Sequence, residues 1–422
     1  MFDPKFGRAA RMGSGLAMVA MLAAPAATQQ QQQVFPPIAR YTIDAGTMSG
    51  MAGMGRGGGM GAAMSMMGGG GARAMHEMTL RIGSTRTPTG APTAEHFMPA
   101  GAGLGKSVQL LTPTPSASPR ETPVEGQLPK GRLLIYWGCG PTAPKNQPVV
   151  IDFAKMAKGQ MPAGLYAPPM NLPGDWDIKP SNSKTYADWP NSKDGKSLKP
   201  GGSILGAHRI VSSYAPEIAF TLNQDYMPAL NARSSVQPSG SILINWNSLP
   251  SATGYYAWAF SAKGDGRGQP TDMVWWASSA TQAFGGPLWD WLSPAAVQKL
   301  IAAKTVMPPS QTSCEIPAEV KKAGGEMTMG SLYAYGPELH FANPPRPSDV
   351  KIPWKPDWTT RVRFRSYTMF MAGMPGMEEM MGSRGAMEDA DESEAGDNPP
   401  PARKPKCRGL GGIAQRAAGL CE

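Results

Sequence analysis

Apolar and polar side chains alternate in short runs along the middle of the chain. In the first clear run, Met78, Leu80 and Ile82 alternate with Thr79 and Arg81, which is the pattern of a strand with one buried face. Gly, Pro or Asn residues bound such runs. We expect further strands at 106–111, 132–137, 149–153, 204–211, 218–222, 332–335 and 361–370. The chain is therefore predicted to be mainly β.

The most specific strand pattern follows residue 240. Residues 241–246 (SILINW) alternate like a strand, and a Pro-containing turn (SLPSATG) leads into the run 255–258 (YYAW). This stretch resembles the second and third strands of a fibronectin type III domain, in which a Trp on the first of the two packs into the sandwich. The resemblance covers about 228–260. It implies a fibronectin III-like or immunoglobulin-like β-sandwich for 223–372.

One helix is predicted inside that sandwich, within an insertion that family members lack. Ser293 can cap its N-terminus and Pro294 suits its first turn. Val297, Leu300 and Ile301 then form an apolar stripe. We expect a helix over 293–304.

Low-complexity sequence flanks the predicted strands. Residues 29–33 are all Gln, and 46–75 hold 12 Gly and 8 Met. Such segments bury too little apolar surface to offset their backbone entropy. The expected organisation is two β-sandwich-like domains between disordered tails. Its parts are a signal peptide (1–26), a disordered Gln/Gly/Met-rich segment (27–75), a β-rich domain with long loops (76–222), the fibronectin III-like sandwich (223–372), a disordered Met/acidic/Pro segment (373–406) and a Cys-closed helix (407–422).

The first 26 residues have the form of a secretory leader. Lys5, Arg8 and Arg11 precede an apolar run, and Ala24-Pro25-Ala26 supplies the small residues at a cleavage site. A retained membrane anchor is the alternative. The chain as a whole resembles exported proteins of Gram-negative bacteria. We expect export to the periplasm, cell surface or medium, with no transmembrane span after cleavage.

Export bears on the four cysteines and on the net charge of +9. Disulfides form in oxidising compartments, and the favoured pairs are Cys139–Cys314 and Cys407–Cys421. In the alternative, Cys139 and Cys314 are free. The basic charge suits anionic envelope polysaccharide, lipid head groups or another envelope protein, although it also serves solubility alone. An exported protein rarely meets nucleic acid, so no such partner is expected.

No catalytic constellation is present. Residues 100–107 match a phosphate-loop pattern without the strand and helix that it needs, and 181–184 match a Ser-x-x-Lys spacing within a Pro/Lys-rich loop. The four His residues are scattered, which disfavours zinc. We therefore name no catalytic residue and no cofactor-binding residue.

Methionines concentrate in the low-complexity segments. Met371, Met374, Met377 and Met380 recur every third residue. Their thioethers could bind a soft ion such as Cu(I) or Ag(I). Low-complexity drift and sacrificial oxidation remain alternatives.

Six tryptophans occur within 46 residues, from Trp246 to Trp291. Trp246 and Trp258 are expected in the core. Adjacent Trp275 and Trp276 must point to opposite faces of a strand, so one of them is a candidate platform on which a sugar ring could stack.

These observations favour a non-enzymatic envelope or surface protein that binds glycan or another envelope component. Soft-metal binding through the Met-rich tails is one alternative. A carbohydrate-active enzyme is another, and it would need two carboxylates about 5–10 Å apart.

Overall fold

The computed structural model describes residues 31–50, 74–113, 131–160, 177–191, 193–194, 196–264, 270–283, 285–325 and 327–372. Within these ranges the protein is mainly β, as predicted, and its strands form three sheets. No described helix is long and apolar enough to cross a membrane.

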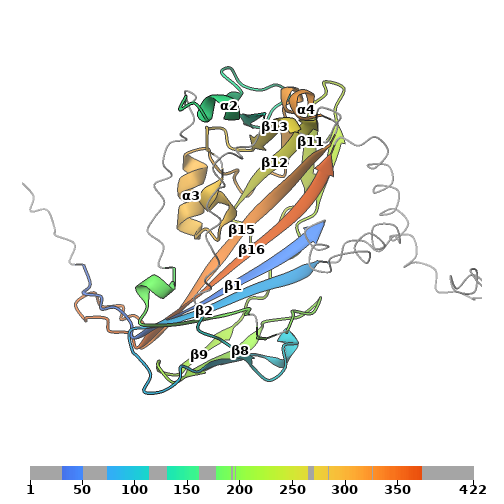
Figure 1. Cartoon of the computed structure of the whole chain (residues 1–422). Helices are drawn as coiled ribbons and strands as arrows, with labels where there is room; N and C mark the ends of the chain where they lie inside the picture. The colour runs from blue at the N-terminus through green and yellow to red at the C-terminus, as the bar shows by residue number, and fades with distance from the viewer. Residues whose placement is uncertain are drawn as a thin grey trace, which may run out of the picture.

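The largest sheet has nine strands in the order β6-β5-β13-β12-β15-β16-β1-β2-β7, and its long central strands run diagonally through the molecule (Figure 1). Two neighbouring pairs, β1 with β16 and β13 with β5, are parallel, and the other neighbours are antiparallel. The strands are β1 (Ala39–Gly50), β2 (Met75–Ser84), β5 (Arg132–Trp137), β6 (Val149–Asp152), β7 (Thr185–Trp189), β12 (Gly254–Gly264), β13 (Pro270–Ala277), β15 (Thr328–Asn343) and β16 (Trp358–Ala372).

Two smaller sheets have the orders β10-β11-β14 and β4-β3-β8-β9. Their strands are β10 (Ala232–Val236), β11 (Ile242–Trp246), β14 (Ser313–Ile316), β3 (Ala94–Phe97), β4 (Val108–Gln109), β8 (Gly206–Ser212) and β9 (Ile218–Leu222). The helices are short: α2 (Phe153–Met156), α3 (Pro294–Ala302) and α4 (Ala318–Gly324), with 3₁₀ turns η2 (Ala100–Ala102), η3 (Pro180–Asn182) and η4 (Gly286–Trp289).

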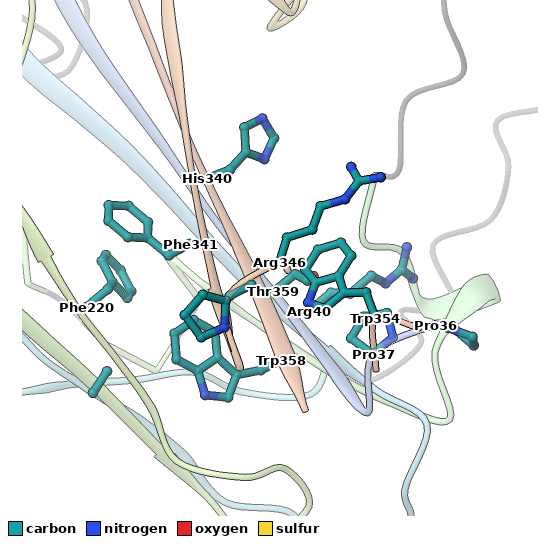
Figure 2. Close-up of a pocket in the computed structure, with 13 residues that line it drawn as sticks. Pro36, Pro37, Arg40, Phe220, His340, Phe341, Arg346, Trp354, Trp358 and Thr359 are labelled. Carbon is teal, nitrogen blue, oxygen red and sulfur yellow. The ribbon is translucent and has the colours of Figure 1, made fainter. Parts of the chain in front are cut away.

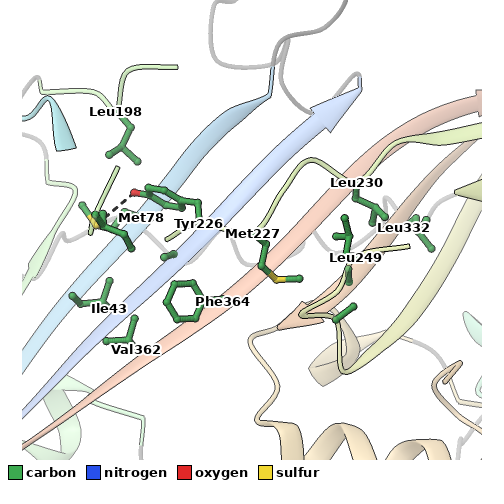
Figure 3. Close-up of a cluster of buried hydrophobic side chains, with 14 of the residues drawn as sticks. Ile43, Met78, Leu198, Tyr226, Met227, Leu230, Leu249, Leu332, Val362 and Phe364 are labelled. Atoms are coloured by element: carbon green, nitrogen blue, oxygen red, sulfur yellow. Dashed lines mark hydrogen bonds between the residues drawn. The ribbon is translucent and has the colours of Figure 1, made fainter. Parts of the chain in front are cut away.

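The main hydrophobic core lies between one face of the large sheet and both smaller sheets. From β1 and β16 it receives Tyr41, Ile43, Val362 and Phe364, and Met78 packs beside Tyr226 (Figure 3). The opposite face carries a second cluster, in which α3 covers residues of β12 and β15. That cluster contains Tyr256, Ala277, Leu288, Val297, Leu300, Val306 and Tyr335. The face of the large sheet that carries the main core is called the core face, and the opposite face, which carries the second cluster, is called the outer face.

Strand β1 corrects the prediction that all of 27–75 is disordered. Thr42, Asp44, Thr47 and Ser49 are buried in it, and their polarity hid the strand pattern in the sequence. Asp44 is buried because two arginines on neighbouring strands bind its carboxylate. The strand therefore forms through partners far away in the sequence.

The predicted boundary at residue 222 does not divide the large sheet. Strands from 39–189 and from 254–372 pair within it through β13 with β5 and β1 with β16. Parallel neighbours of this kind are set by distant contacts, and local patterns carry no signal for them. The large sheet therefore contains strands from both sides of the predicted boundary.

Two local predictions are confirmed. Helix α3 lies within the predicted 293–304, and its N-cap Ser293 accepts a hydrogen bond from the Ala296 N–H. Cys139 and Cys314 form a disulfide. The predicted leader, the pair Cys407–Cys421 and the segments 373–406 and 407–422 lie outside the described residues.

Candidate functional site

A groove lies near the C-terminal half of β15, where this strand has no strand neighbour on its β12 side among the described residues. Strand β12 pairs with β15 from Thr328 to Tyr335, whereas β16 pairs with it as far as Asn343. Residues 338–343 of β15 therefore have a strand partner on one side only within the described chain. Beside these residues, the segment before β1, strand β9, the start of β16 and the loop between β15 and β16 line a groove of about 910 Å³ (Figure 2).

Aromatic side chains form the apolar part of the groove. Phe220 of β9 stacks on Phe341 of β15, with ring centroids 4.8 Å apart. Trp358 of β16 is buried and Trp354 is half-buried. Pro36, Pro37 and Pro345 complete the wall. Phe220 and Trp358 are buried, so the partly exposed rings of Phe341 and Trp354 are the faces that suit a sugar ring or another planar ligand.

Cationic side chains line the same groove. The Arg346 guanidinium lies 5.4 Å from the Trp354 ring centroid, and its Nε donates to Gln32 Oε1. Arg40 donates to Asn182 Oδ1 at 3.0 Å. Partial burial, together with nearby Arg361, lowers the pKa of Arg40.

The groove therefore places Arg346 next to aromatic side chains, whereas Arg40 lines it from the opposite face of the sheet, because its neighbours Ala39 and Tyr41 point into the main core. None of its described lining residues is acidic. A carboxylate lies beside it: Glu338 Oε1 is 2.6 Å from Nε2 of the lining residue His340. This arrangement can hold a ligand that carries both apolar faces and negative charge.

The predicted platform residues lie on opposite faces of β13, as their adjacency required. Trp276 is fully buried on the core face, and its Nε1 donates to the Gly138 carbonyl. Trp275 is half-buried on the outer face and stacks on Trp258, with centroids 4.8 Å apart and planes 10° apart. Trp289 lies 5.4 Å from Trp275 and is 38% exposed.

This indole cluster offers little free ring surface. Trp275 gives one face to Trp258 and also contacts Trp289 and Phe260. Trp246, expected in the core, is buried against Tyr255. Trp258 is half-buried within the outer-face cluster and not on the core face.

Charged side chains bridge the strands on the outer face between the indoles and the groove. Asp44 accepts hydrogen bonds from Arg81 of β2 and Arg363 of β16, and its side chain is fully buried. Arg365 bonds Glu77, and its guanidinium stacks 4.1 Å above the Trp291 ring. Paired charges of this type hold the strands in register but are not free to bind a ligand.

A chain of buried hydrogen bonds lies behind the groove on the core face. Tyr41 Oη lies 2.8 Å from His96 Nδ1, His96 Nε2 lies 3.0 Å from His208 Nδ1, and His208 Nε2 lies 2.7 Å from the Ile204 carbonyl. Because a carbonyl can only accept, His208 Nε2 carries a proton. With neutral rings, His96 Nε2 donates to His208 Nδ1 and Tyr41 Oη donates to His96 Nδ1. Burial lowers the pKa of both rings.

Only one of the four methionines predicted to bind a soft metal ion lies within the described residues. Met371 lies near the end of β16, whereas Met374, Met377 and Met380 fall outside the described residues. Among the residues that are described, no group of three His, Cys, Asp or Glu side chains could hold a metal. The phosphate-loop pattern of 100–107 forms η2 and irregular chain before β4, so no helix follows it.

Sequence reasoning missed the groove. Its walls come from 36–40, 219–220, 340–346 and 354–359, which are far apart in the chain. The available signal was the run Pro344-Pro345-Arg346-Pro347 with two tryptophans shortly after it. No protein-family model matches this chain, and no curated protein sequence is significantly similar to it.

Proposed function

We propose that this is an exported, non-catalytic binding protein whose groove takes an acidic polysaccharide of the cell envelope. The observation that supports it best is the groove itself, where the Arg346 guanidinium lies 5.4 Å from the Trp354 ring centroid and Phe341 is partly exposed nearby. Sugar rings stack on aromatic faces, and guanidinium groups pair with carboxylates in two-point contacts.

The character of the whole chain supports the same ligand. Its net charge is +9, and a basic protein accumulates anionic polymers near its surface. The Cys139–Cys314 disulfide is consistent with an oxidising compartment.

A fibronectin III-like framework is part of this proposal. Consecutive strands β11 and β12 lie in different sheets, and Trp246 packs between them. The orders β10-β11-β14 and β13-β12-β15-β16 would then form the two facing sheets of the sandwich. On this view, β5-β6 and β1-β2-β7 extend one of those sheets on either side, and the groove lies at an end of the extended sheet.

The binding test uses the full chain with polygalacturonate, which carries one carboxylate per sugar, and with uncharged dextran. We expect retention on polygalacturonate that weakens as salt rises. Arg346→Gln should weaken binding by about fivefold, which corresponds to about 1 kcal/mol for a charge-assisted hydrogen bond.

Arg209 provides a matched control. Its guanidinium is also exposed and lies 4.5 Å above an aromatic ring, that of Phe97, but it is not among the lining residues. Arg209→Gln should bind like the wild type. An equal loss of binding in both variants would show that net charge alone, and not the groove, causes retention. No retention of the wild type on polygalacturonate at low salt would refute the proposal.

A further inference from the structure

Three methionines share the outer face where β15 and β16 end beside each other. Met329 of β15 pairs directly with Met371 of β16, and directly opposite side chains have Cβ atoms about 5 Å apart. Met369 lies two residues before Met371, so it points to the same face. All three side chains are only half-buried.

Residues of β12 and β15 flank these methionines. Ser331 stands opposite Met369 on β15, and Trp258 of β12 stands opposite Ser331. The small serine therefore separates Met369 from the indole of Trp258. In the next row, Phe260 stands opposite Met329. Aromatic side chains thus border the methionines on the β12 side.

Packing alone does not explain this group. Met78 and Met227 are buried and fill the core, which is the usual use of methionine. Met329, Met369 and Met371 are instead half-exposed on the face away from the main core. Strand positions of that kind usually carry β-branched, aromatic or polar residues.

We propose that Met329, Met369 and Met371 form a binding site for a soft monovalent cation of the Cu(I) or Ag(I) class. Thioethers are soft neutral ligands that select such ions, and they need no deprotonation. Flexible methionine side chains on adjacent strand positions can turn their three sulfurs toward one ion. Of the four methionines predicted from the sequence, this site contains Met371. Met329 and Met369 were not predicted, because the sequence pattern did not show that they lie beside it.

The test is a titration of the full chain, labelled with ¹³C at its methionine methyl groups, with Ag(I). Silver avoids the air oxidation of Cu(I). We expect the methyl resonances of Met329, Met369 and Met371 to shift together and to saturate at one equivalent. Tryptophan fluorescence should change over the same range because Trp258 lies beside the site.

Replacing all three by Leu keeps the apolar volume nearly constant, so the fold should survive, as circular dichroism can check. This variant should lose the fluorescence change. Met98→Leu is the control, since Met98 is also partly buried but packs against the main core. It should retain the full response.

Two outcomes would overturn the site. In one, silver shifts only methionines outside 329–371, which would assign binding to other segments of the chain. In the other, the triple Leu variant gives the wild-type fluorescence titration. The polysaccharide proposal is independent of both results, because none of these methionines lines the groove.

Discussion

Gly46 shows how a single missing side chain permits a contact across a strand. Glu77 of β2 reaches over β1 to Arg365 of β16, with 2.8 Å between Glu77 Oε1 and Arg365 Nη2. A Cβ at Gly46 would lie 2.5 Å from Glu77 Oε1 and 2.6 Å from its Cγ. The glycine therefore leaves the space that the glutamate side chain occupies.

Gly46→Ala should destabilise the protein by about 1–3 kcal/mol, because Glu77 must move and Arg365 loses a charge-assisted hydrogen bond. Chemical denaturation measures this loss. Gly90→Ala is the control, since a Cβ there meets nothing within 4 Å. Equal stability of the two variants would contradict the role assigned to Gly46.

The buried pair His96 and His208 should make the protein sensitive to acid. Burial lowers both folded-state pKa values below the usual 6.5, so the unfolded chain binds more protons once the pH drops below about 6.5. The stability due to the neutral rings is present above that pH. It is lost as the pH falls toward the folded pKa values, by about 1.4 kcal/mol per pH unit for each ring.

Denaturation curves between pH 7 and 5 test this slope. The double variant His96→Gln, His208→Gln should have a flatter dependence than the wild type, whatever its absolute stability. A double variant as acid-sensitive as the wild type would show that other groups dominate.

At the scale of elements, the disulfide ties together two parts of the fold. Cys314 lies on β14 of the three-stranded sheet, and Cys139 follows β5 in the large sheet. The bridge spans 175 residues. Closing so long a loop should stabilise the folded protein by about 3–5 kcal/mol in the chain-entropy model.

Cys139→Ser with Cys314→Ser should therefore lower the thermal midpoint by several degrees, as scanning calorimetry can measure. The variant Cys407→Ser with Cys421→Ser leaves this bridge intact and should melt near the wild type. Should the first variant melt at the wild-type temperature, the bridge would be dispensable for stability.

Elements with local determinants were predictable from the sequence. Strand β11 alternates visibly, β12 contains the apolar run YYAW after a Pro-containing turn, and Ser293-Pro294 marks the start of α3. Strand β1 was not predictable in this way. Its buried Asp44 and Thr42 look like surface residues until Arg81 and Arg363 are known to lie on both sides.

At the scale of the whole molecule, distant pairing decides both the sheet and the candidate site. The parallel contact of β1 with β16 joins residues more than 300 positions apart, and the groove forms beside the end of that contact. Periodicity predicts which residues form strands, but not which strands meet. Adjacency predicted that Trp275 and Trp276 lie on opposite faces of a strand, as they do, but the groove is built from aromatic residues of other elements.

The central claim, that the groove binds acidic polysaccharide, is tested most directly by the indole N–H resonances of Trp354 and Trp289. The ligand is a trigalacturonate, with uncharged maltotriose as the control. We predict that trigalacturonate shifts Trp354 saturably, less so at high salt, and leaves Trp289 in place. No shift at Trp354, or an equal shift with maltotriose, would contradict the account.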